Sequence, residues 1–212
     1  MKLPTEQQCL DYFTEYKVPK NIFNHCKKVR EVASFLAQQL TKRGISLHVE
    51  LVDRTALLHD LFKMVTIKEL KPNKFHNYTF SEDEIIMWKK LREQYPHKYE
   101  GEVAFILFKD TYPDLALALR NVSNPRHENP GWEEVVVHYA DWRIFQEKIV
   151  SLQERLLYLQ EMYPRDDAAW KRYEQKMKNQ EDMIFSHLDF SPEELKEAIE
   201  NGNEAIKEVM KQ

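Results

Sequence analysis

A histidine and an aspartate stand side by side in "RTALLHDLFK", residues 54–63, inside an otherwise apolar run. A carboxylate taken out of water is costly unless a partner stabilises it, so His59 and Asp60 require one. Neutral imidazole and ionised carboxylate are good ligands for divalent metals, and a bound ion removes the penalty of burying the charge. The pair is therefore a candidate for metal binding, although a structural, hydrogen-bonded pair has the same composition.

Two further polar groups in apolar surroundings are candidates to join the pair. Asp141 lies in "VVVHYADWRIFQEKI" between tyrosine, alanine and tryptophan, and His25 lies near the start of "NHCKKVREVASFLAQQLTKRG", one step from its apolar stripe. His138 precedes Asp141 by three residues and shares its side of a helix, where we expect it to pack or hydrogen-bond rather than bind metal. Imidazoles and carboxylates that converge from separate helices indicate a divalent metal site.

The elements that must position these residues are helices. Glycine is scarce, with four residues, and apolar residues recur at spacings of three and four, which predicts an all-α protein. Residues 46–64 can hold two short helices, the second with Asp53 near its start and the His-Asp pair toward its end. Residues 24–44 form a helix that ends at Gly44, with a stripe made of Cys26, Val29, Ala33, Leu36 and Leu40.

Helical patterns continue through the rest of the chain. The segment 65–96 combines loop residues with one helix, "SEDEIIMWKKLREQY", in which Ser81 and Glu84 fit a capping box. Helices follow over "HKYEGEVAFILFKD", broken before Pro113, and over residues 113–124, ending at Pro125. A long helical pattern starts near Trp132 and continues past residue 145 to residue 163, and another covers residues 166–188.

Composition bounds the function. The 212 residues carry a net charge of -4 with 31% charged residues, which disfavours a nucleic-acid polymer as partner. Cys9 and Cys26 have no paired spacing, which argues for a reducing compartment, the cytoplasm, and against a disulfide framework or thiolate zinc site. No apolar stretch approaches a membrane-spanning length, so we expect a soluble protein without a membrane partner.

The order of these residues resembles the HD-domain superfamily of metal-dependent phosphohydrolases. His25 in "NHCKKVREVA", His59 and Asp60 in "ALLHDLFK", and Asp141 in "VHYADWR" look like the family's four metal ligands, and the resemblance covers residues 20–150. It implies an HD-type helical bundle as a phosphohydrolase domain over residues 1–150. Residues 151–212 would form a C-terminal helical extension that packs on the core or on a second subunit in a homodimer.

The resemblance also implies roles for three residues outside that set. Some branches of the family bind two ions, and His97 in "PHKYEGEVA" and His127 in "NPRHENPG" resemble their additional ligands, although each also fits a loop histidine beside a proline. Lys63 falls where relatives place a lysine that meets the substrate phosphate. The sequence departs from the family at Phe62, where many relatives have glycine or alanine, and in residues 65–95, a longer segment than expected where substrate identity would be set.

The resemblance implies hydrolysis of a phosphate ester or phosphoanhydride of a nucleotide, or of a related small phosphorylated metabolite, through a metal-activated water. Asp60 and Lys63 would be catalytic, and the cofactor would be one or two divalent ions of iron, manganese, cobalt, nickel or zinc. Glu102 and Arg143 are candidates to support the ligands. The alternative is a catalytically silent HD-fold module that binds nucleotides or proteins, favoured by Phe62 and the long segment.

Overall fold

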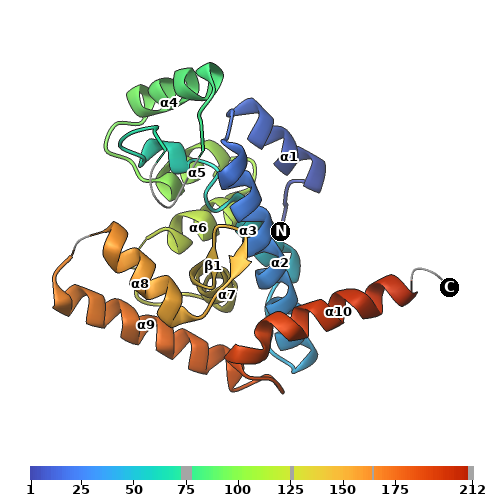
Figure 1. Cartoon of the computed structure of the whole chain (residues 1–212). Coiled ribbons are helices and arrows are strands. Elements are labelled where there is room, and N and C mark those ends of the chain that lie inside the picture. The colour runs from blue at the N-terminus through green and yellow to red at the C-terminus, as the bar shows by residue number, and fades with distance from the viewer. Residues whose placement is uncertain (73–77, 125–126, 164, 210–212) are drawn as a thin grey trace.

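The computed structural model describes residues 1–72, 78–124, 127–163 and 165–209; residues 73–77, 125–126, including the predicted helix end at Pro125, 164 and 210–212 lie outside this description. The described chain is helical apart from one short hairpin, so the predicted all-α class is confirmed (Figure 1). The elements are α1 Glu6–Glu15, α2 Lys20–Lys42, α3 Val49–Leu58, η1 Lys63–Val65, α4 Glu82–Gln94, α5 Glu100–Phe108, α6 Pro113–Val122, α7 Trp132–Trp142, β1 Ile144–Phe145, β2 Lys148–Ile149, α8 Leu152–Met162, α9 Asp167–Phe185, η2 Pro192–Glu194 and α10 Leu195–Val209.

Helix α2 runs through the middle of the molecule (Figure 1). Its predicted apolar stripe, from Cys26 to Leu40, is fully buried. The helix ends at Lys42, and Gly44 follows with φ +84°, a left-handed conformation that glycine adopts without strain. Because α2 begins at Lys20, His25 lies in its second turn rather than at its first residue, and its side chain projects from the body of the helix.

Two hydrophobic clusters share α2 and α3. One contains the buried side chains of α2 from Val29 to Leu40, Val52 and Ala56 of α3, and buried side chains of α7 to α10. The other contains buried side chains of α1, the first turns of α2, Leu51, Leu57 and Leu58 of α3, and residues of α4 to α6. His25 lies in the first half of α2 and Asp141 near the end of α7, so the candidate residues lie near the region where the two clusters meet.

The segment with the His-Asp pair differs from the prediction of two short helices. A single helix, α3, covers Val49–Leu58, and His59 is the residue that ends it. Turns closed by backbone bonds from Leu61 to Leu58 and from Lys63 to Asp60 lead into η1. The pair therefore follows a helix end instead of lying inside a helix, which leaves carbonyls of the last turn of α3 without helical partners.

The predicted long helix after Trp132 was wrong beyond Trp142. Helix α7 ends there, and β1 pairs antiparallel with β2, with Ile144 opposite Ile149 and Phe145 opposite Lys148. The tight turn between the strands holds Gln146 at φ +57°. A new helix, α8, then begins with a capping box between Ser151 and Glu154, and the box fixes where helical structure resumes.

The remaining predicted helices are present. Ser81 and Glu84 form the predicted capping box of α4, and α5, α6 and α9 lie within the predicted segments. Helices α8 to α10 bury Leu156, Trp170, Met177, Ile184, Leu195 and Ile199 in the same cluster as α2 and α7. The C-terminal half of α10 projects away from the rest of the molecule (Figure 1). Across the described residues, every helix is too short or too polar to cross a membrane.

Candidate metal centre

Two imidazoles from different helices turn the same ring nitrogen toward one shared carboxylate. His25 of α2 and His59 at the end of α3 have ring centroids 5.4 Å apart. The Nε2 atom of His25 lies 2.9 Å from Oδ1 of Asp141, and Nε2 of His59 lies 3.8 Å from the same oxygen. One ligand atom each from His25, His59 and Asp60 can be chosen so that all lie within 4.8 Å of one another. This spacing fits donors around a single ion.

The other ring nitrogen of each histidine faces a backbone carbonyl. Nδ1 of His59 lies 2.8 Å from the carbonyl oxygen of Ala56, one of the acceptors left where α3 ends. Nδ1 of His25 lies 3.4 Å from the carbonyl of Gln146 in the hairpin turn. If each Nδ1–H donates to its carbonyl, each Nε2 keeps its lone pair for a metal, which is the arrangement that orients ligating histidines in metalloproteins.

Contacts also hold the hairpin against α2. Asn24 donates to Glu147 at 2.9 Å, one residue before His25 contacts Gln146. The left-handed conformation of Gln146 turns the chain within two residues of β1, so its carbonyl meets α2. The hairpin that interrupts the predicted helix is therefore an element that positions His25.

Both carboxylates of the centre are ionised. Burial raises the pKa of Asp141, but the hydrogen bond and charge of His25, together with His59 and Arg155, hold it well below its usual range. Burial also raises the pKa of Asp60, and the charges of Lys63 and His59 outweigh this effect and keep it lowered. Asp60 places Oδ2 3.7 Å from Nε2 of His59 and Oδ1 3.3 Å from Nζ of Lys63. Two negative charges thus face two imidazoles in a site that is largely enclosed.

His59 is the most buried polar residue of the centre, with its side chain 4% exposed. Burial lowers its pKa, but the charges of Asp60, Cys26 and Asp141 raise it to about 9. Among the described residues, its buried Nε2 has no hydrogen-bond partner. A divalent ion that replaced the proton at Nε2 would satisfy this atom and both carboxylates, so the residues present fit a metal.

Sequence reasoning missed a carboxylate beside Lys63. Nζ of Lys63 lies 3.0 Å from Oε1 of Glu100, the first residue of α5, as well as close to Asp60. Burial lowers the pKa of Lys63, but the two carboxylates raise it well above its usual value, so the side chain remains a cation. Glu100 gave no signal in the sequence because an acidic residue in the first turn of a helix is ordinary.

Sequence reasoning also missed Arg155, which lies in the predicted C-terminal extension. It belongs to the first turn of α8, and its Nη2 lies 3.9 Å from Oδ1 of Asp141. Its guanidinium lies over the ring of Tyr158, 5.2 Å from the centroid. In "SLQERLLYLQ" a lone arginine on an amphipathic helix is typical of a solvated face, and only the packing of α8 reveals its position.

The structure does not bring His97 and His127 into this group. His97 is exposed, with φ +61°, between α4 and α5. Nε2 of His127 lies 3.0 Å from Oε2 of Glu134, a carboxylate that also accepts from Gly131 and Asn121. Among the described residues, the cluster able to hold an ion consists of His25, His59 and Asp60, with Asp141 in contact with both histidines.

Several other sequence expectations can be placed. Phe62 is 1% exposed and packs against Tyr16 and Phe108, with ring centroids 4.7 and 6.2 Å away, so its bulk fills the core. Arg143 is buried and donates to the carbonyls of Val150 and Pro192. Glu102, the other candidate to support the ligands, caps α5 and pairs with Lys98. His138 hydrogen-bonds as expected, since its Nδ1 lies 2.8 Å from Oε1 of Gln180.

Comparisons with models of protein families, with curated proteins and with solved structures found no match for this chain.

Proposed function

We propose that this chain is a metal-dependent phosphohydrolase of the HD type. It would cleave a phosphate ester or phosphoanhydride of a nucleotide, or of a related small phosphorylated metabolite. The observation that carries the proposal is the orientation of His25 and His59: each turns Nδ1 toward a backbone carbonyl and Nε2 toward ionised carboxylates. A structural hydrogen-bonded pair would have no reason to leave the buried Nε2 of His59 without a partner.

The proposed ligands are His25, His59, Asp60 and Asp141, and we propose a single ion. His97 is exposed, and His127 is already paired with Glu134, so neither supports a second ion. The mixed imidazole and carboxylate donors suit manganese, iron, cobalt, nickel or zinc. Such an ion would activate a water molecule and offset the charge that develops on the phosphate.

The residues of the chain have separate tasks in this proposal. Asp60 has Oδ2 toward His59 and Oδ1 toward Lys63. It can therefore bind the ion through Oδ2 and accept a hydrogen bond from Lys63 at Oδ1. Lys63 is 35% exposed, which leaves its ammonium accessible to a phosphate group. Glu100 holds that ammonium in place through a 3.0 Å hydrogen bond. The substrate would meet a preorganised cation beside the ligands.

The silent-module alternative loses one of its two supports. Phe62 was one reason to expect a blocked site, but its ring packs in the core with Tyr16 and Phe108. The other reason was the long segment 65–95, part of which lies outside the described residues. No observation on the described residues favours the module over the enzyme, so the enzyme is the function that we propose.

Chromatographic analysis of the products formed from a substrate panel tests the proposed function. The panel contains nucleoside mono-, di- and triphosphates, dinucleoside polyphosphates and sugar phosphates, each with manganese, iron, cobalt, nickel or zinc added. We expect turnover of at least one class, and a loss of about a hundredfold or more in Asp60→Asn. Asp110→Asn, an exposed position outside the centre, is the control and should match the wild type. A metal-loaded wild type that hydrolyses no member, or an Asp60→Asn variant that retains full activity, would contradict the proposal.

A further inference from the structure

Arg155 lies at the edge of the metal centre, although it belongs to a segment that the family resemblance does not cover. Its helix, α8, begins after the hairpin, and its guanidinium lies over Tyr158. Tyr158 in turn packs on Phe145 of β1, with ring centroids 4.5 Å apart. The arginine side chain is 14% exposed, so it is held on an aromatic support rather than extended into solvent.

One edge of the Arg155 guanidinium has a donor without a hydrogen-bond acceptor among the described residues. This donor is the buried Nε atom of Arg155. Its Nη2 is 3.9 Å from Oδ1 of Asp141, close enough for attraction but too far for a hydrogen bond. Nε–H and Nη2–H form one edge of a planar fork that matches two oxygens of a carboxylate or phosphate. A buried charged donor without an acceptor is costly, so an external anion is the natural partner.

The charges of the site favour such an anion once an ion is bound. Three carboxylates, Asp60, Glu100 and Asp141, face two cations, Lys63 and Arg155, which leaves one negative charge when the imidazoles are neutral. A divalent ion would change this to one positive charge. The net positive charge of the metal-loaded site then attracts an oxyanion. The acceptor oxygens of such an anion match the Nε and Nη2 donors of Arg155.

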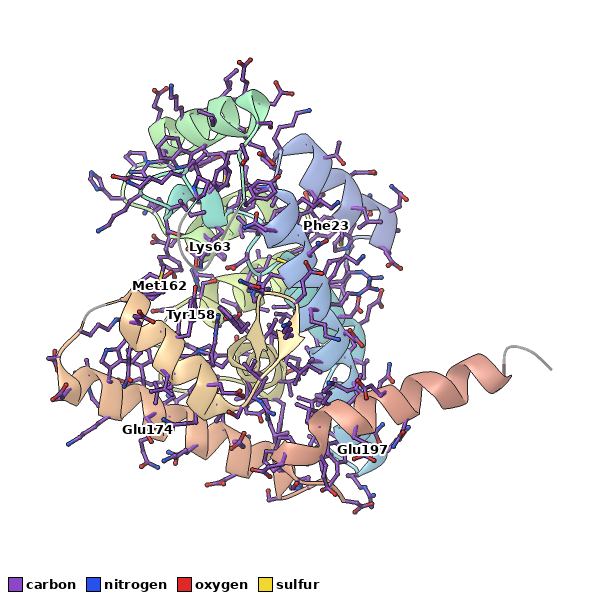
Figure 2. All side chains as sticks on the ribbon, viewed as in Figure 1. Phe23, Lys63, Tyr158, Met162, Glu174 and Glu197 are labelled. Atoms are coloured by element: carbon purple, nitrogen blue, oxygen red, sulfur yellow. The ribbon has the colours of Figure 1, made fainter. Side chains whose placement is uncertain are left out.

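We propose that Arg155 anchors a phosphate group of the substrate through its Nε and Nη2 edge, as a second cation besides Lys63. The inference rests on the proposed function for the bound ion and assigns the substrate contact to α8, outside residues 1–150. Lys63 and Tyr158, from η1 and α8, lie in the same region of the molecule (Figure 2). Burial raises the pKa of Tyr158, and the charges of Arg155 and Lys63 oppose this effect. The two cations therefore border the centre from different elements, as a phosphate clamp requires.

Calorimetric titration of inorganic phosphate into the full-length, manganese-loaded protein tests this role. We expect Arg155→Met to bind phosphate about tenfold or more weakly than the wild type while it keeps the same manganese content, and Arg155→Lys to fall between them. Arg165→Met is the matched control, because Arg165 also lies over aromatic rings, those of Trp170 and Tyr173. This control should bind phosphate as the wild type does.

Several outcomes would overturn the inference. Unchanged phosphate affinity in Arg155→Met would do so, and so would a loss of manganese with normal phosphate binding after reloading, since Arg155 would then only position Asp141. A wild type that binds manganese but no phosphate would overturn the inference alone, whereas one that takes up no metal would overturn the proposed function as well. If circular dichroism shows that Arg155→Met is unfolded, Arg155→Lys decides, and wild-type affinity in that variant would contradict the proposal.

Discussion

At the scale of single residues, the centre depends on which nitrogen of each imidazole faces the carboxylates. The backbone carbonyls of Ala56 and Gln146 set this choice for His59 and His25. The sequence could predict the four residue types and their order, and the structure brings His25, His59 and Asp60 together, with Asp141 in contact with both histidines. It could not predict the carbonyl partners, because these depend on where α3 ends and where the hairpin turns.

The residues that sequence reasoning missed are ordinary charges made specific by tertiary contacts. Glu100 follows a loop at the start of α5, and Arg155 lies on an amphipathic helix remote in sequence from Asp141. Charged residues at such positions are usually solvated, so neither had a local signal. Conversely, His97 and His127 were expected as ligands because they resemble the additional histidines of two-metal relatives, and the structure places them in other surroundings.

Acid should destabilise the protein through His138. Burial lowers its pKa below the ordinary 6.5, an effect that Lys176 strengthens and the hydrogen bond with Gln180 only partly offsets. The unfolded chain therefore takes up a proton at a pH where the folded chain does not, so stability present above pH 6.5 is lost as the pH falls below it. The His138→Gln variant lacks this titrating group, so the free energy of unfolding of the variant should fall less with acid than that of the wild type.

Urea unfolding with chelator present, between pH 7.5 and 5, measures this difference, because the other histidines contribute equally to both proteins. Parallel pH profiles for the two proteins would show that His138 is not held neutral by burial.

At the scale of elements, helix ends position the chemistry. The sequence predicted a continuous helix after Trp132 because "RIFQEKIVSLQER" contains no glycine or proline. The chain nevertheless turns at Gln146, whose φ of +57° is unusual for a residue other than glycine. A turn of this kind has no strong sequence signal, whereas Gly44 and the capping box of α4 are local signals from which a helix end and a helix start were predicted.

The packing of α5 on α6 should depend on Gly101. A Cβ atom at this position would lie 2.7 Å from the carbonyl oxygen of Leu119 and 2.9 Å from Cα of Arg120, both backbone atoms of α6. Gly101→Ala must push the helices apart, so we expect a loss of about 1–3 kcal/mol in the free energy of unfolding. Chemical denaturation measures it.

The control for Gly101→Ala is Gly131→Ala, since a Cβ there would meet only Glu133 at 3.5 Å. Gly131 is the residue that caps α7, so alanine should cost less than about 1 kcal/mol. Equal losses in the two variants would mean that the close approach of α5 and α6 contributes little.

At the scale of the whole molecule, the C-terminal helices complete the core around α7. Tyr139 donates to Glu181 at 2.6 Å, and buried Arg143 donates to the carbonyl of Pro192 at 2.9 Å. Six apolar side chains from α8 to α10 are buried in the cluster that contains α2 and α7. The sequence predicted these helices from their periodicity but could not show which surface they cover.

A chain that ends at residue 150 should therefore fail to fold cooperatively. Burial of each large apolar side chain from α8 to α10 contributes about 1.5–3 kcal/mol, and their sum is comparable with the whole stability of a typical domain. Arg143 would also lose its contacts with Glu181 and Pro192. Thermal unfolding followed by circular dichroism, with gel filtration, tests this, and a sharp transition in a monomeric 1–150 chain would contradict it.

The metal content of the full chain, purified without chelator, tests the central claim most directly. Elemental analysis of the wild type should find about one equivalent of a divalent transition metal, with none in His59→Ala and a normal amount in His97→Ala. Two equivalents in the wild type, with one lost in His97→Ala, would contradict the single-ion centre. A wild type that takes up no metal, even after reconstitution with manganese or iron, would contradict the metal centre itself.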